Sequence, residues 1–253
     1  MRMQYHKHGV PLSATRALGE TRAFLEPLLQ GRRRVLDVGC GQGELAQALA
    51  WAGHEVTALD VKLPMAPAPV PGLTWHEEGF LTFESEPFDA ILFVTSLHHL
   101  SPLADAVEQA RRLLVPGGLL LVEEFALEAP DATTARWYYG VQELLAAAGR
   151  YPPERITGDA SMDPLERWRH AHEHEPLSEG RRMREEVGRR LELLDAREGP
   201  YLYRYLVAGV AEAVGGDIQL MESLSAQLFE AERRDVASGV LKPVGLRLVA
   251  RKP

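Results

Sequence analysis

The stretch VLDVGCGQGELAQAL, residues 35–49, constrains the fold of this 253-residue chain more than any other stretch. An apolar run ends near an aspartate and is followed by three glycines at positions 39, 41 and 43. The apolar residues after the glycines recur at helical spacing, at Leu45, Ala48, Leu49 and Ala52. The pattern predicts a buried strand, a tight glycine turn and the start of a helix. Such turns commonly bind nucleotides.

Strand and helix patterns alternate through residue 125. Strands are expected at 32–39, 54–60, 73–78, 88–96 and 118–125. Helices are expected at 14–30, 44–52 and 101–114, the last with Ser101 as N-cap and Pro102 in its first position. VPGG (115–118) reads as a turn. This alternation predicts an α/β fold with a parallel, doubly wound sheet.

The chain beyond residue 125 is mostly helical in pattern. Helices are expected at 131–148, 163–175, 178–190 and 221–235, and strands at 191–198 and 244–252. The segment PYLYRYLVAG (200–209) fits a strand by its alternating tyrosines and a helix by its aliphatic spacing. We therefore expect an N-terminal helical arm (1–30), a cofactor-binding α/β core (31–125), a helical cap (126–190) and a C-terminal part that completes the sheet (191–253).

The residues around the glycine turn discriminate between nucleotides. A dinucleotide fingerprint would place a third glycine where this chain has Glu44, and no G-K-[ST] phosphate loop follows. Asp37 and Glu44 would both face a pyrophosphate with negative charge, which offsets the attraction of the helix dipole. S-adenosylmethionine (SAM) has an ammonium, a sulfonium and no phosphate. Asp37 could face its positive end, and Asp60 could accept its two ribose hydroxyls.

Four motifs in order resemble class I SAM-dependent methyltransferases: VLDVGCGQGELA, ALD at 58–60, FDAILFVTSLHHL and RRLLVPGGLLLVEE. The resemblance implies a Rossmann-like sheet of seven mostly parallel strands with an antiparallel last strand, which VGLRLVARK would form. It implies a helical cap inserted after the fifth strand. It also implies methyl transfer from SAM, with S-adenosylhomocysteine as product, to an acceptor that we expect to be a small molecule.

The resemblance also implies a set of cofactor-binding positions. They are Asp37, Gly39, Cys40, Gly41, Asp60, Val61, Glu78, Gly79, Phe80, Thr95 and Ser96. WHEEGFL offers Glu77 or Glu78 for the adenine amino group; Glu78 is preferred, with Gly79 and Phe80 lining the ring. The helix that usually follows the second strand in this family is replaced by the proline-rich KLPMAPAPVPG.

Candidate catalytic residues lie after the fourth strand and in the cap. His98 and His99 follow the fourth strand, where either could be a general base or simply pack; His99 is preferred. Seven aromatics after the fifth strand could pack a core or line an acceptor pocket: Trp137, Tyr138, Tyr139, Trp168, Tyr201, Tyr203 and Tyr205. We expect Tyr139, Trp137 or His172 to reach the acceptor, and the arm with Tyr5 and His8 to close over it.

Other classes of function find less support. His170, His172 and His174 have metal-ligand spacing but no evident third ligand, so no metal is expected. Cys40, the single cysteine, lacks a basic neighbour that would activate it. A net charge of -8 disfavours a nucleic-acid partner. No signal peptide or membrane span is visible, so a cytoplasmic enzyme of open oligomeric state is expected. The alternatives are a non-catalytic SAM-binding module and a nicotinamide-dependent oxidoreductase.

Overall fold

The computed structural model describes residues 16–63, 69–172 and 177–253. The chain divides into two compact units. The sheet unit comprises the described parts of Glu20–Glu128, Pro176–Glu198 and Gly245–Pro253. The helical unit comprises the described parts of Met1–Gly19, Ala129–Glu175 and Gly199–Val244. Tyr5, His8 and His174 lie outside the described residues.

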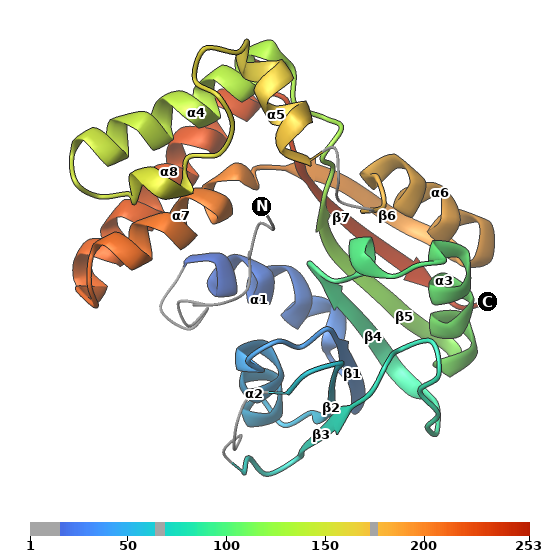
Figure 1. The fold of residues 1–253 in the computed structure, drawn as a ribbon. Helices are drawn as coiled ribbons and strands as arrows, with labels where there is room; N and C mark the ends of the chain where they lie inside the picture. Colours follow the sequence, from blue (N-terminus) through green and yellow to red (C-terminus); the bar gives the residue numbers. More distant parts are fainter. Residues whose placement is uncertain (1–15, 64–68, 173–176) are drawn as a thin grey trace. The chain divides into compact units, whose positions relative to one another are not determined.

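The sheet unit contains one seven-stranded sheet in the order β3-β2-β1-β4-β5-β7-β6 (Figure 1). The strands are β1 (Arg34–Val38), β2 (Glu55–Asp60), β3 (Leu73–Glu77), β4 (Phe88–Val94), β5 (Leu114–Phe125), β6 (Glu192–Gly199) and β7 (Gly245–Arg251). The first five strands pair in parallel, and β7 pairs antiparallel with β5. The expected doubly wound sheet with an antiparallel last strand is confirmed.

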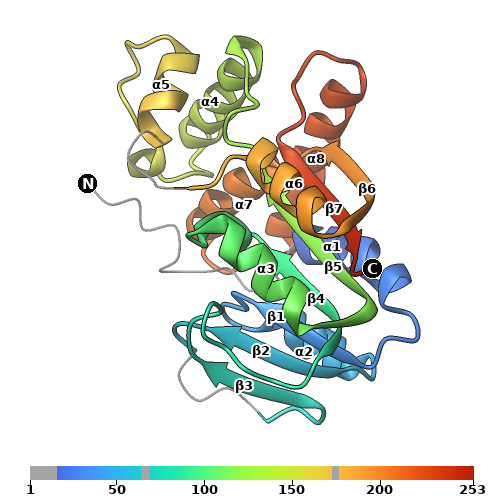
Figure 2. The same ribbon diagram turned by 90° about the vertical axis from the view of Figure 1, so that its right-hand side faces the viewer.

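Helices cover both faces of this sheet. α3 (Leu103–Leu113) and α6 (Gly180–Arg190) lie on one face, and α1 (Arg16–Leu29) and α2 (Glu44–Trp51) lie behind it on the other (Figure 2). Because both faces are covered, consecutive residues of these strands are apolar and buried, such as Val35 and Leu36 of β1 and Leu92 and Phe93 of β4. The main core packs β4 against α3 and α6 through residues such as Phe93, Val107 and Val187.

Two local expectations around α3 are wrong. Pro102, not Ser101, is the N-cap of α3, because its ψ of 136° is extended and the helix begins at Leu103. VPGG is not a free turn between helix and strand, because β5 already begins at Leu114. The Gly117 N–H donates to the Lys252 carbonyl (2.9 Å), and the Lys252 N–H donates to the Gly118 carbonyl (2.9 Å). Backbone hydrogen bonds to Lys252, which is far away in the sequence, therefore keep this segment in the sheet.

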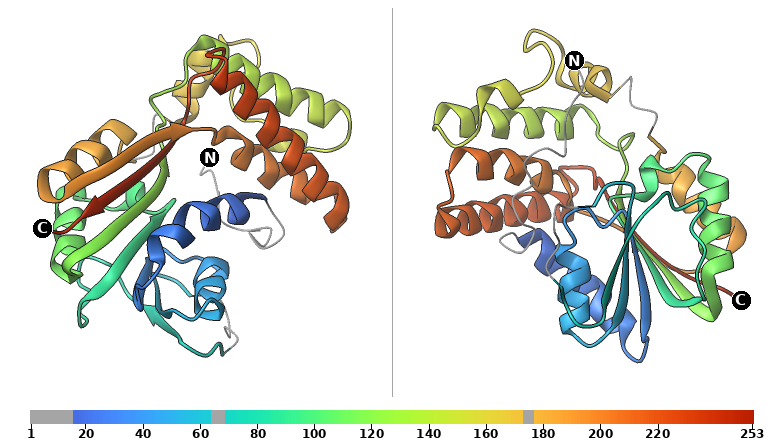
Figure 3. Two further views of the ribbon diagram at one scale, coloured as in Figure 1. Left: turned by 180° about the vertical axis from the view of Figure 1, so that it is seen from behind. Right: turned by 60° about the horizontal axis from the view of Figure 1, so that its bottom comes forward.

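The helical unit contains α4 (Ala132–Ala147), η3 (Pro153–Arg155), α5 (Pro164–His172), α7 (Leu202–Ala213) and α8 (Ile218–Ala237) (Figure 3). The ambiguous segment 200–209 is helical. Glu232 of α8 is fully buried and accepts the N–H groups of Tyr201, Leu202 and Tyr203 (2.6–2.8 Å). It satisfies the donors that the first turn of α7 leaves unpaired.

The units divide the chain differently from the expected segments. α6, placed in the cap by sequence, belongs to the sheet unit, whereas α7 and α8 belong with α4 and α5. Glu128 accepts the N–H groups of Gly180 and Arg181 (3.1 and 2.9 Å), which joins the residues after β5 to the start of α6. In the part of the chain that the structure describes, no helix is long and apolar enough to cross a membrane.

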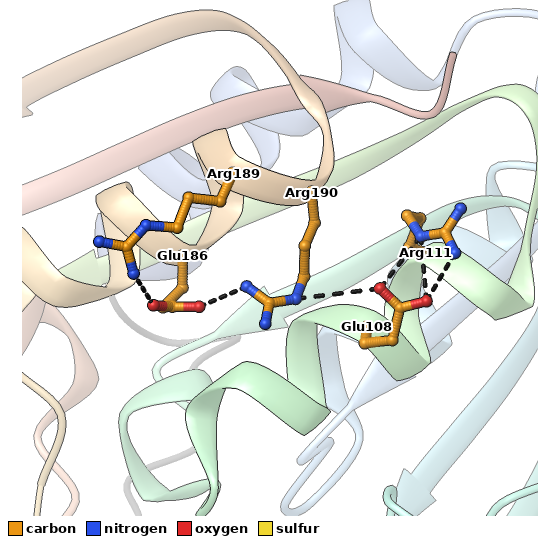
Figure 4. A network of polar contacts seen from close by, with 5 residues as sticks. All are labelled: Glu108, Arg111, Glu186, Arg189 and Arg190. Atoms are coloured by element: carbon orange, nitrogen blue, oxygen red, sulfur yellow. Dashed lines mark hydrogen bonds and ion pairs between the residues drawn. The ribbon is translucent and has the colours of Figure 1, made fainter.

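An ion-pair network joins the outer surfaces of α3 and α6 (Figure 4). Glu186 pairs with Arg189 and Arg190, and Arg190 also lies 3.9 Å from Glu108, which pairs with Arg111 at 2.6 Å. Most of these side chains are exposed to solvent. Exposed pairs of this kind contribute little to stability, so the buried apolar contacts beneath them hold α6 on α3.

A buried carboxylate joins α1, β5 and β7 within the sheet unit. Glu123 of β5 is 3% exposed. It accepts the Thr21 hydroxyl of α1 and lies 2.6 Å from the Arg247 guanidinium of β7. The Arg247 guanidinium also donates to the Glu20 carbonyl (3.1 Å). Three segments far apart in sequence thus meet at one charge.

We expect Arg247→Met to lower the free energy of unfolding by about 2–4 kcal/mol, because Glu123 would stay buried without its cation. Glu123→Gln together with Arg247→Met should lose less, since no charge remains. Arg251→Met is the matched control, because its pair with Glu192 is nearly half exposed and should contribute at most about 1 kcal/mol. Thermal and urea unfolding would measure all three, and equal losses at Arg247 and Arg251 would contradict the assignment.

Candidate cofactor and acceptor site

The glycine turn lies at the C-terminal edge of the sheet, between β1 and α2. The N–H groups of Gly39 and Cys40 both donate to the Leu59 carbonyl of β2 (2.8 and 3.1 Å). Gly39, Gly41 and Gly43 all have positive φ (73°, 55° and 76°), a conformation that only glycine adopts without strain. Apart from its chain neighbours, no atom of the described residues would lie within 4 Å of a Cβ at Gly41, so these residues leave that side of the turn open.

Asp60, at the end of β2, fastens this turn to the neighbouring strand. Its Oδ2 accepts the Gly41 N–H (2.9 Å) and its Oδ1 accepts the Lys62 N–H (3.1 Å). Each carboxylate oxygen has a second lone pair, so Asp60 can still accept two ligand hydroxyls. Val61, the next residue, is 74% exposed.

Asp37 is the unusual charge of the site. It lies in β1 between β2 and β4 and is 2% exposed. Its carboxylate makes no hydrogen bond and no ion pair with the described residues. Burial, followed by repulsion from Asp60, raises its pKa to about 7. A buried carboxylate without a compensating partner is costly, and a nearby cation would reduce that cost.

The residues after β4 face the same turn. Ser96 is buried and its hydroxyl donates to the Val38 carbonyl (2.6 Å). A Cβ at Gly39 would lie 2.5 Å from the Ser96 Cβ, so these two segments touch. Thr95 has a φ of 56°, which is strained for a β-branched residue. Such strain is concentrated at functional sites.

The residues that were expected to contact adenine lie in the segment that ends β3 and follows it. The Glu77 carboxylate accepts the Leu63 N–H (3.0 Å), whereas the Glu78 carboxylate is exposed and has no partner among the described residues. The role of Glu78 at the adenine amino group stays a prediction. Gly79 is half-buried, but Phe80 differs from expectation. Its ring is 3% exposed and packs edge-to-face on Phe93 at 5.3 Å, so it belongs to the core of the sheet unit.

The two histidines after β4 have different surroundings. His98, in η2 (Leu97–His99), is buried, and its Nδ1 lies 2.7 Å from Oε2 of the buried Glu124. The His98 N–H also donates to Oε1 of the same carboxylate (3.2 Å). His99 is exposed, and its ring lies 4.0 Å from that of His98. A carboxylate that holds one ring nitrogen is the usual arrangement for a histidine base, which favours His98 over His99.

The acceptor residues expected in the cap lie in the helical unit. Tyr139 is buried, with the Arg167 guanidinium 4.0 Å from its ring centre, and burial raises the pKa of its hydroxyl. His172 donates from Nδ1 to the Trp168 carbonyl (2.7 Å), and its ring lies 4.4 Å from that of Trp168. Trp137 is half-buried. Their approach to the acceptor stays a prediction.

Most of the seven aromatics pack within the helical unit. Tyr138 is the centre of the cluster, with the rings of Tyr139, Trp168 and Tyr205 at 5.3, 5.4 and 6.4 Å. Gln142, also buried, donates to the hydroxyls of Tyr138 (3.0 Å) and Tyr151 (2.9 Å). These contacts show packing within the helical unit, and a further role in lining an acceptor pocket stays a prediction.

Cys40 and the histidine-rich segment show no reactive or metal-binding arrangement in the described residues. Burial and the charges of Asp37 and Asp60 raise the pKa of the Cys40 thiol, which keeps it protonated. Among the described residues, no three metal-binding side chains gather.

Two site residues were missed by sequence reasoning. Glu124 stands within the apolar run GLLLVEEF, and its partner His98 is 26 positions away. Trp75, in the short strand LTWHE, lies against Gly43 on the first turn of α2. No periodicity in the sequence indicates either contact.

Comparison with known proteins agrees with this geometry. Residues 10–174 match the model of a methyltransferase domain family. An uncharacterized methyltransferase of Mycobacterium bovis is 34% identical over 118 residues, 43% of this chain and 57% of that protein. A ubiquinone biosynthesis O-methyltransferase of Xylella fastidiosa is 38% identical over 103 residues, 35% of this chain and 40% of that protein. The matched part is thus 57% of one relative's length and 40% of the other's.

A solved structure extends the likeness to the whole fold. A phosphoethanolamine N-methyltransferase of Haemonchus contortus, in complex with phosphomonomethylethanolamine and S-adenosylhomocysteine, has a TM-score of 0.58. It is 15% identical, and the alignment covers 97% of this chain and 55% of that one. This likeness establishes the fold.

We expect Asp37→Asn to stabilise the ligand-free protein at pH 8 by about 2–4 kcal/mol, because the pKa shift penalises the charged carboxyl by that order. The folded protein holds the Asp37 proton more tightly than the unfolded chain. The stability that the folded protein gains from this tighter proton binding is therefore fully present below about pH 4 and is lost as the pH rises to about 7. The gain from Asn should grow across this window in thermal melts, and a gain that is independent of pH would contradict it.

Proposed function

Because the chain belongs to the methyltransferase-domain family, we propose that it is a class I enzyme that transfers a methyl group from SAM to a small-molecule acceptor. SAM supplies a methyl group on a cationic sulfur, which a nucleophile displaces in line. The residues of the chain bind, align and desolvate the two reactants, an effect that lowers the barrier without much acid–base chemistry.

The observation that carries this proposal is Asp37. It is buried, lacks a partner among the described residues and has a pKa raised to about 7. A cation at this position would lower that pKa and relieve the cost of burying the charge. The positively charged end of SAM fits this requirement, whereas a pyrophosphate would add repulsion. This favours SAM over a nicotinamide dinucleotide.

The residues proposed for the remaining cofactor contacts lie at the same edge of the sheet. Gly39 and Gly41 let the ligand approach the backbone, and Asp60 would accept the ribose hydroxyls. The exposed carboxylate of Glu78 follows β3, and we propose that it accepts the adenine amino group, with the exposed Val61 after β2 contacting the ligand. Thr95, Ser96 and the main chain of Cys40 would complete the pocket.

A small-molecule acceptor is supported by charge and by similarity. The net charge of -8 disfavours a polyanionic substrate. The similar Xylella fastidiosa protein acts, by its name, in ubiquinone biosynthesis. We propose a hydroxyl acceptor, because His98 is held by Glu124 in the manner of a general base.

In this proposal Glu124 fixes the tautomer of His98. Its carboxylate accepts the Nδ1–H, which leaves Nε2 as the proton acceptor. Nε2 makes no hydrogen bond within the described part of the chain. The proton of the acceptor hydroxyl would move to Nε2 as the oxygen attacks the methyl group. His99, whose ring lies 4.0 Å from that of His98 at a tilt of 43°, would shield this proton from solvent.

The cofactor assignment predicts that the protein binds SAM and S-adenosylhomocysteine and does not bind NAD. Asp60→Ala should weaken SAM binding by about 1–3 kcal/mol, because the ribose hydroxyls lose their acceptor. Isothermal titration calorimetry would measure both. Micromolar NAD binding without a response to SAM would refute the proposal.

Asp89→Ala is a matched control for Asp60→Ala. Its carboxylate also accepts two backbone N–H groups, from Arg33 and Arg34 (both 2.8 Å), but it lies at the opposite edge of the sheet. Its loss should lower the melting temperature and leave SAM affinity unchanged. Equal losses of affinity at Asp60 and Asp89 would show that Asp60 acts only through stability.

The base assignment predicts that Glu124→Gln slows transfer to a hydroxyl acceptor by about 10²-fold or more. SAM affinity should stay within a few-fold. His99→Ala should have the smaller effect. The acceptor is found by incubating the protein and SAM with metabolite pools and measuring S-adenosylhomocysteine. Tight SAM binding without product in any pool would favour a non-catalytic SAM-binding module instead.

A further inference from the structure

Trp75 of β3 touches the glycine turn from the side. A Cβ built on Gly43 would lie 2.0 Å from the Trp75 Cη2 and 2.6 Å from Cζ3. The six-membered ring of the indole therefore lies directly against the Gly43 main chain. No residue other than glycine can occupy position 43 while this ring is in place.

Gly43 is where the turn becomes a helix. It is the N-cap of α2, with φ 76° and ψ 18°, and no side chain caps this end of the helix. The Gly43 N–H donates to the Cys40 carbonyl (2.8 Å), which closes the turn on itself. The position of Gly43 thus determines where the Gly41 N–H and the first turn of α2 lie.

Trp75 reaches this position from the edge of the sheet. β3 is the outermost strand on this side, and Trp75 is paired with Ala58 of β2, not with β1. The Trp75 Nε1–H is buried and has no hydrogen-bond partner among the described residues. An unpaired buried donor costs about 1–3 kcal/mol, a cost that phenylalanine or leucine would avoid. The larger indole ring therefore has a role at this position that phenylalanine or leucine would not fill, namely its contact with Gly43.

We infer that Trp75 is a positioning residue for SAM. Its ring packs against Gly43 and thereby fixes the glycine turn in the position in which its backbone can contact the ligand. The turn is then fixed from two directions. The Leu59 carbonyl and Asp60 hold its first half, and Trp75 holds its second half. This inference rests on the proposed function, since it assumes that the turn binds SAM.

A first set of variants separates positioning from stability. Trp75→Leu should weaken SAM binding about tenfold, equivalent to about 1.4 kcal/mol, and Trp75→Phe should restore part of it. Phe83→Leu is the matched control, because this buried ring contacts His76 and Phe88 rather than the glycine turn. It should lower the melting temperature by a similar amount with SAM affinity unchanged. Equal affinity losses in both variants would overturn the inference.

A double-mutant cycle tests the contact itself. Gly43→Ala should abolish most SAM binding, because its methyl group would overlap the indole. In the Trp75→Leu background the overlap is relieved and only the strain of the positive φ remains. The double variant should therefore bind SAM more tightly than Gly43→Ala alone. If it binds no better, Trp75 does not set the turn.

Gly41→Ala is the control for this cycle. It carries the same backbone strain, but its methyl group would meet no protein atom, so its effect should be the same in both backgrounds. The melting temperatures of the four proteins report the Gly43–Trp75 contact without any ligand. If the wild-type protein failed to bind SAM, the proposed function would fall, while this thermal cycle would still decide whether the contact exists.

Discussion

The burial of one carboxylate, Asp37, is the constraint on which the site depends. β1 has a strand on each side, so Asp37 near its C-terminal end is buried. Asp60 of the neighbouring strand β2 adds a second negative charge. The backbone N–H groups of Gly39, Cys40 and Gly41 donate to the Leu59 carbonyl and the Asp60 carboxylate, and none of them donates to Asp37. A chain selected only for stability would place a neutral side chain here. Stability is commonly lost in this way where a site must bind charge.

Much of the sheet unit could be predicted from periodicity and turn chemistry. β1 and β4 lie within segments that were predicted as strands, and the predicted tight turn between β1 and α2 is present, with positive φ at Gly39, Gly41 and Gly43. The local errors have tertiary causes. The segment VPGG stays in the sheet because Lys252 pairs with it, and no nearby residue shows that partner. The alternating tyrosines at 201–205 lie on a helix, whose first turn is held by Glu232.

The candidate site was predictable where one segment supplies it and unpredictable where two segments meet. Asp37 and Asp60 end predicted strands, so their position at one edge follows from a parallel sheet. His98 and Glu124 become partners only because β4 and β5 are neighbours in register. Trp75 reaches Gly43 across β2, a contact that depends on the side-chain direction of an edge strand. The division of the helices between the two units likewise follows from packing rather than from chain order.

The order of strands in the sheet has a consequence for biosynthesis. β7 lies between β5 and β6, although the ribosome makes it after both. Until residue 251 has emerged from the exit tunnel, β5 lacks its antiparallel neighbour, and Glu123 lacks the Arg247 cation. From the emergence of β5 until the emergence of β7, the nascent chain therefore presents an open strand edge and an uncompensated charge. The sheet can be completed only after β7 has emerged, so the open edge of β5 is prone to wrong strand pairing during this interval.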